Sequence, residues 1–138
     1  MRAARPLLAL LAACCAVPAA LAALSKDAYQ AHRERIQAEY QAQAARCKPL
    51  ERQAQGICLA AAKGQRQVAR AQLEWQYKPS PANEEKFRLA QAEAGYAVAR
   101  ERCGAHKGHV REICRKDAKA AFAAARAEAL SSRVAGSP

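Results

Sequence analysis

Two stretches of the chain carry the same cysteine frame, and this frame decides how the chain can fold. Residues 46–58 read RCKPLERQAQGIC, and residues 102–114, 56 positions later, read RCGAHKGHVREIC. At this offset eleven residues find an identical partner without a gap. In the first unit they are Ala38, Tyr40, Arg46, Cys47, Ile57, Cys58, Ala62, Lys63, Ala69, Arg70 and Ala71. Matches in one frame over so long a stretch predict an internal duplication.

The N-terminal segment differs in character from the rest of the chain. It reads MRAARPLLALLAACCAVPAALAA, a basic start and an apolar run that ends in small residues. This pattern predicts a secretory signal peptide over residues 1–22, cleaved after Ala22. Residues 11–14 read LAAC, which has the shape of a lipobox, so a lipoprotein anchored at Cys14 is the alternative. Both interpretations predict export, with no transmembrane span in the mature chain.

The remainder of the chain is one small, basic domain. It holds about 115 residues, enough for a modest core but not for a large cavity. Removing Arg2 and Arg5 leaves 21 basic against 12 acidic residues, a net charge of about +9. A charge of this size and sign favours anionic partners, including a membrane surface.

The spacing of apolar residues is helical throughout the exported part. One seam steps by three and four along the chain through Ile57, Ala61, Gly64, Val68, Ala71 and Trp75. Threonine is absent and Asn83 is the only asparagine of the mature chain, so strand-rich folds are poor fits. We expect an all-α fold with four helices, over residues 26–47, 52–77, 81–103 and 109–131.

These helices predict two duplicated hairpins joined by a short linker. Pro79 and Pro81 stop one helix, and Ser80 can cap the next. The expected organisation is hairpin repeat 1 over residues 23–78, a Pro-rich linker over 79–82, hairpin repeat 2 over 83–131 and a disordered tail over 132–138.

The exported chain keeps four cysteines, and export permits all of them to be oxidised. They are Cys47, Cys58, Cys103 and Cys114. Residues eleven apart in an unbroken helix lie about 16 Å apart, too far for a disulfide, so a local bridge requires a chain reversal. Breakers inside both frames supply one: Pro49, Gly56, Gly104 and Gly108. We favour local pairs that clamp each bend, while crossed pairs between two antiparallel helices, Cys47 with Cys114 and Cys58 with Cys103, stay open.

Three stretches carry a resemblance to a known group of proteins. They read AEYQAQAARC, ICLAAAKGQRQVARAQLE and QYKPSPANEEKFRLAQAEAGYAVARERC. The chain resembles a family of small alanine- and lysine-rich secreted proteins of Gram-negative bacteria, loosely TolA-like in composition. The resemblance covers nearly the whole mature chain, and YKPSP with the two cysteine pairs is its specific part. It implies a helical periplasmic protein and no particular activity. The bends KPLERQAQ and GAHKGHVR depart from the polar, asparagine-containing bends of that group.

No set of residues assembles an active site. The mature serines lie near the ends or in the linker, and a Gly-rich phosphate loop, a usefully spaced carboxylate pair and a CxxC motif are all missing. We therefore expect a non-enzymatic protein without catalytic residues and without a cofactor. A nucleic-acid partner is not expected, because export removes the chain from the genome and aromatic residues for base stacking are few.

Basic residues on the expected helices form the candidate binding surface. They are Lys63, Arg66, Arg70, Arg111, Arg115, Lys116 and Lys119. They predict an envelope-associated structural or adaptor module that binds an anionic envelope component or a periplasmic protein. The alternative is a chaperone-like helical cradle for unfolded envelope proteins.

The second bend adds two histidines to the cysteine frame. Cys103, His106, His109 and Cys114 form C-x2-H-x2-H-x4-C, which offers sulfur and imidazole ligands for zinc or copper. An oxidised Cys103–Cys114 pair removes both thiolates and leaves two imidazoles. We expect no specific metal site, with His106 and His109 as weak candidates.

Overall fold

The computed structural model describes residues 24–135, and this part of the chain is helical with short connections. Its elements are α1 (Lys26–Cys47), α2 (Arg52–Tyr77), α3 (Pro81–Arg102), the 3₁₀ turn η1 (Cys103–Ala105) and α4 (Gly108–Ala135). The all-α prediction with four helices is confirmed. The predicted signal peptide and Cys14 lie outside the described residues.

Side-chain caps explain where α1 and α3 begin. The Ser25 hydroxyl accepts a hydrogen bond from the Ala28 amide at 3.1 Å, and Ser80 does the same for Asn83 at 3.2 Å. Pro81 occupies the first turn of α3, where its missing N–H costs no helical hydrogen bond. The linker between α2 and α3 therefore ends one helix and starts the next within three residues.

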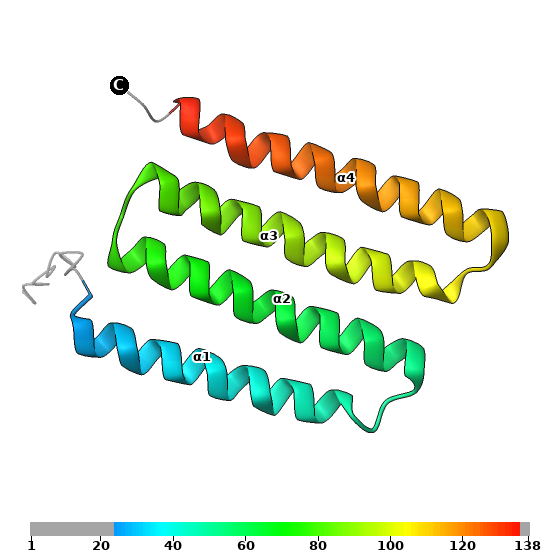
Figure 1. Ribbon diagram of the computed structural model, residues 1–138, viewed down its shortest axis with the longest axis horizontal. Coiled ribbons are helices and arrows are strands. Elements are labelled where there is room, and N and C mark those ends of the chain that lie inside the picture. Colours follow the sequence, from blue (N-terminus) through cyan, green and yellow to red (C-terminus); the bar gives the residue numbers. More distant parts are fainter. Residues whose placement is uncertain (1–23, 136–138) are drawn as a thin grey trace, which may run out of the picture.

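The four helices lie side by side in a single layer, as Figure 1 shows. Each helix runs antiparallel to the one before it, and the substantial packing contacts among the described helices join α1 with α2, α2 with α3, and α3 with α4. In a closed four-helix bundle α1 and α4 would also meet. Here they form the two edges of the layer, so the inner helices α2 and α3 each pack on two sides.

The core is thin, because it consists of the seams between neighbouring helices. Its buried side chains are Tyr29, Cys47, Ala62, Leu73, Cys103, Ala118 and Ala129. Aromatic pairs stack across the three seams: Tyr29 on Tyr77, Trp75 on Phe87, and Tyr96 on Phe122. Small residues allow the helices to approach closely, but they bury little area each.

The last helix is longer than the sequence predicts. It begins at Gly108, whose φ of 53° lies in the left-handed region that glycine adopts without strain. It continues to Ala135, four residues beyond the predicted end, because no glycine or proline interrupts the chain before Gly136. Residues 132–135 of the predicted tail are thus helical, and residues 136–138 lie outside the described part.

Candidate binding surfaces

Both cysteine pairs are local disulfides at the hairpin bends. Cys47 is bonded to Cys58 and Cys103 to Cys114, each pair with its α carbons 5.6 Å apart. The local pairing is confirmed and the crossed alternative is wrong, because each frame reverses direction and brings its own two cysteines together. The two bends that carry these bridges lie at the same end of the layer (Figure 1).

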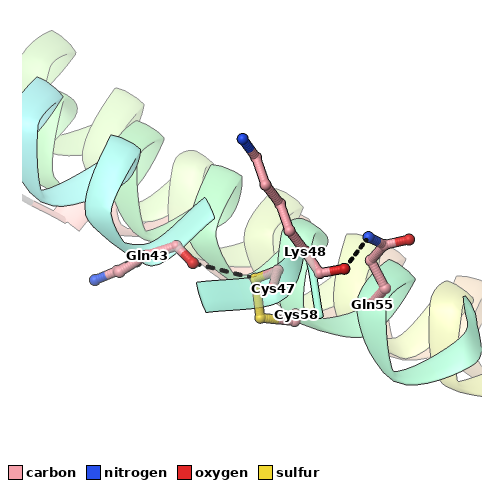
Figure 2. The surroundings of a disulfide bond; sticks show 5 residues. All are labelled: Gln43, Cys47, Lys48, Gln55 and Cys58. Carbon is pink, nitrogen blue, oxygen red and sulfur yellow. Dashed lines mark hydrogen bonds between the residues drawn. A yellow bond between two sulfur atoms is a disulfide. The ribbon is translucent and has the colours of Figure 1, made fainter. Parts of the chain in front are cut away.

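The first bend is held by backbone and amide hydrogen bonds around its disulfide (Figure 2). Leu50 donates its amide to the Cys47 carbonyl at 3.2 Å, and the Gln55 side chain donates to the Lys48 carbonyl, also at 3.2 Å. Cys47 Sγ lies 3.3 Å from the Gln43 carbonyl oxygen, a contact without a proton because the sulfur is oxidised. The bend is also tied to α3, since Gln53 donates to the Glu101 carbonyl at 2.5 Å.

The disulfides indicate the compartment. Bridges of this kind form and persist in oxidising, extracytoplasmic environments. Within residues 24–135 no helix is both long and apolar enough to cross a membrane.

One side of the layer, here termed the basic face, gathers positive charge from three helices. Lys63 of α2 and Arg100 of α3 line the same groove on this side. Helical spacing extends the row along α2 and α3 from these two residues. On α4 the row lies opposite Asp117 and Ala121, which line a groove with Arg102 on the other side of the layer. The basic members are Arg52, Lys63, Arg70, Lys86, Arg100, Arg115, Lys119 and Arg126. The acidic residues on this side are Glu74, Glu93, Glu112 and Glu101, which lines the same groove as Lys63 and Arg100.

The structure brings part of the predicted binding set together on this face. Its members there are Lys63, Arg70, Arg115 and Lys119, which are exposed. Arg66 is half-buried, with its guanidinium carbon 4.0 Å from the centre of the Tyr40 ring. Arg111 donates to the His106 carbonyl at 2.6 Å, and the exposed Lys116, two residues before the buried Ala118, points away from α3.

Other members of the basic face are absent from the predicted set. They are Arg52, Lys86, Arg100 and Arg126. Arg126 could have been predicted from the sequence. It repeats Arg70 at the offset of 56, and it lies seven residues, or two helical turns, after Lys119. Lys86 and Arg100 belong to α3, and only the order of helices in the layer shows that α3 fills the gap between α2 and α4.

The opposite side of the layer, here termed the alanine face, carries little net charge and is grooved. A groove of about 500 Å³ runs between α2 and α3. Its lining consists of Ala61, Gln65, Val68, Ala69, Gln72, Ala94, Gly95, Val98, Ala99 and Arg102. A second groove of about 520 Å³ follows between α3 and α4, where Val110 and Ile113 are 57% and 45% exposed.

The two histidines of the second bend do not gather ligands around them. His109 lies 3.5 Å from Glu112, one helical turn along α4, and both side chains are largely exposed. Among the described residues no three His, Cys, Asp or Glu side chains stand close enough together to hold a metal ion.

Near the open end of the first hairpin, a buried tyrosine is bonded to a carboxylate. Tyr29 donates its hydroxyl proton to Glu74 Oε1 and stacks on Tyr77, with 4.4 Å between the ring centres. The hydrogen bond to Glu74, together with burial of the ring, raises the pKa of Tyr29 above its ordinary value of 10.0. This pair joins α1 to α2 at the end of the layer that has no disulfide.

Comparisons of the chain with known protein families, with curated proteins and with solved structures found no match.

Proposed function

We propose that the protein is a non-enzymatic periplasmic module that binds an anionic surface of the cell envelope through its basic face. The observation that carries this proposal is the segregation of charge in a flat layer. Basic side chains of α2, α3 and α4 gather on one side, while the other side is nearly neutral. A flat face can lay all of these charges on an extended surface at once.

The physical scale of such binding follows from the number of charges that reach the surface together. Each Lys or Arg side chain near an anionic membrane contributes about 1 kcal/mol, and salt screens the attraction within a Debye length of about 8 Å at physiological ionic strength. Several charges on one rigid face therefore give strong binding at low salt that weakens steeply as salt rises. The predicted signal peptide, the disulfides and the resemblance to small secreted proteins of Gram-negative bacteria support the cell envelope as the location.

The test compares two triple variants of equal charge on vesicles with anionic or neutral headgroups. The basic-face variant combines Lys63→Gln, Arg100→Gln and Lys119→Gln. Its matched control removes three exposed arginines from outside that face, by Arg35→Gln, Arg46→Gln and Arg102→Gln.

The expected results separate a directed surface from net charge alone. The basic-face variant should lose about 100-fold in affinity for anionic vesicles, from three contributions of about 1 kcal/mol each. The control should bind nearly as well as the natural protein. Equal losses in both variants would show that net charge, and not this face, determines binding, and the proposal would then fail.

A second candidate function is a chaperone-like cradle, and the grooves of the alanine face favour it. They offer apolar surface on an exposed helical layer, which an unfolded segment could cover. The measurement is light scattering of an aggregating envelope protein with and without this protein. Suppression that persists in the basic-face variant but is lost in Gly95→Glu supports the cradle.

A further inference from the structure

The alanine face is an apolar surface without a covering layer among the described residues. Protein domains bury the apolar sides of their helices between two or more layers, and this fold has one. The groove between α2 and α3 shares Gly95 and Ala99 with a further hollow of about 240 Å³ between α3 and α4, so together they form one continuous trough across α2, α3 and α4. Exposed Val110 and Ile113 extend its apolar surface at the end that carries the disulfides.

No contact within the chain itself explains why a glycine, Gly95, stands at the centre of this face. A glycine inside a helix weakens it relative to alanine. At Gly64 the close approach of Ala94 explains the cost, because a Cβ there would lie 2.7 Å from the Ala94 Cβ. At Gly95 a Cβ would meet nothing within 4 Å. A surface that approaches α3 from outside accounts for the missing side chain.

Charge decides which kind of surface can approach. Around the trough the charged residues are of both signs: Arg88, Arg102, Glu84, Asp117 and Glu128. Arg88 and Glu84 are already paired at 2.7 Å. Two copies of this face therefore meet without net repulsion, whereas two basic faces repel each other.

The area of the face is sufficient for a stable pair. Three helices of about 33 Å length, spaced about 9 Å apart, present roughly 900 Å². Stable protein interfaces bury about 800 Å² on each partner. Alanine and glycine side chains also project little from the helices, which lets two helical layers approach closely.

From these observations we infer that the alanine face binds a second copy of this chain, so that two layers stack face to face and form a dimer. The second copy supplies the layer that a single chain lacks. The stacked dimer turns both basic faces outward.

The experiment is sedimentation equilibrium of the exported, oxidised protein at physiological salt over a range of concentrations. Gly95→Glu places a carboxylate in the trough, where the free chain has room for it. A second variant, Gln65→Glu, adds the same charge to the alanine face of α2. Its matched control is Gln67→Glu, two residues along the same helix, which alters the other side of the layer. Circular dichroism checks that all variants keep their helix content.

The natural protein should sediment as a dimer. Gly95→Glu should weaken the dimer at least about 100-fold, because a carboxylate buried in an apolar interface loses its hydration. Gln65→Glu should weaken it in the same direction, and Gln67→Glu should leave it unchanged. A natural protein that stays monomeric up to about 100 µM, or a Gln67→Glu variant that dissociates as readily as Gln65→Glu, would overturn the inference. Binding of an unfolded client to a monomeric natural protein would likewise assign the face to that client.

Discussion

At the scale of single residues, one contact between neighbouring helices occurs in both halves of the molecule but is made by different side chains. Tyr40 and Tyr96 stand 56 positions apart, and each ring meets a side chain of the next helix. Tyr96 stacks on Phe122, with 4.7 Å between the ring centres. Tyr40 meets Arg66, also 56 positions before Phe122, and the buried Nε of Arg66 hydrogen-bonds to no described residue. The Tyr40–Arg66 contact therefore carries a desolvation cost that the Tyr96–Phe122 contact avoids.

Replacing Arg66 by Phe should stabilise the protein. The change removes a buried polar atom that has no hydrogen bond and creates the ring pair found at Tyr96. We expect the free energy of unfolding to rise by about 1 kcal/mol, a shift of about 4 °C in Tm. Thermal melting measures the effect. The reverse change, Phe122→Arg, should lower Tm, and a lower Tm for Arg66→Phe would show that the cation over the ring outweighs its desolvation.

Tyr29 should make stability depend on pH in the alkaline range. The folded state raises the pKa of Tyr29, so it holds the phenol proton more tightly than the unfolded chain does. Its contribution is complete below about pH 10 and is lost as the pH rises through the folded pKa. Tyr29→Phe should lower the free energy of unfolding by about 1 kcal/mol at neutral pH. As the pH rises above about 10, denaturant unfolding should show a smaller loss of stability in the variant than in the natural protein.

At the scale of the helices, the distance between α2 and α3 depends on one glycine. A Cβ at Gly64 would lie 2.7 Å from the Cβ and 3.1 Å from the Cα of Ala94, so backbone must move to admit it. At Gly56 the near atom is the Glu101 carboxylate at 2.9 Å, the far end of a flexible side chain. An added side chain would therefore displace backbone at Gly64 but only a flexible side chain at Gly56.

Gly64→Ala should destabilise the protein, while Gly56→Ala should not. Forcing two packed helices apart costs about 1–3 kcal/mol, more than the gain of up to about 1 kcal/mol in helix propensity. At Gly56 only the propensity gain remains, because the Glu101 side chain can turn away. Urea unfolding of both variants checks the pair, and equal stability of the two would contradict the close approach at Gly64.

The two disulfides should stabilise the hairpins mainly by restricting the unfolded chain. Each closes a short loop between residues eleven apart, which is worth about 3 kcal/mol. Replacing Cys47 and Cys58 together by Ser should therefore lower Tm markedly and leave most of the helix content, as measured by circular dichroism at low temperature. The same exchange at Cys103 and Cys114 serves as the comparison. Unchanged melting in both double variants would refute the stabilising role of the clamps.

At the scale of the whole molecule, the sequence predicts the elements better than their arrangement. Helix bounds follow from local signals such as Ser80 with Pro81, and the clamped bends follow from the breakers between the cysteines. The predicted seam of α2, through Gly64 and Trp75, is the side that meets α3. The opposite side meets α1 through Ala62 and Leu73, but Arg66 interrupts it, so no second seam is visible in the sequence.

Because this second seam is not visible in the sequence, the binding surfaces were only partly predictable. A helix with one apolar seam fits a closed bundle, whereas a helix with seams on opposite sides belongs inside a layer. The order of helices in the layer is what places Arg100 between Lys63 and Lys119. It also leaves the trough around Gly95 open on the other side.

A dimer that turns both basic faces outward should bridge two anionic surfaces. The natural protein should cluster anionic vesicles at low salt, and clustering should vanish as salt rises past about 0.15 M, where the Debye length falls to about 8 Å. Gly95→Glu should still bind the vesicles but not cluster them, because a monomer has one basic face. Turbidity and co-sedimentation measure clustering and binding separately. Clustering by Gly95→Glu equal to that of the natural protein would exclude the face-to-face dimer as the bridge.

The position of both disulfides at one end of the layer has a mechanical consequence. The first and last described residues lie at the opposite end, beside the α2–α3 linker (Figure 1). A force that separates these two ends would peel α1 from α2 and α4 from α3, one turn at a time, toward the bridges. There the load passes from Cys47 straight to Cys58, and from Cys103 to Cys114, so the bends between them carry no tension. Each bridge keeps the ten residues between its cysteines out of the load path. They span eleven steps of the chain, about 37 Å when extended, so each hairpin lengthens under load by that much less.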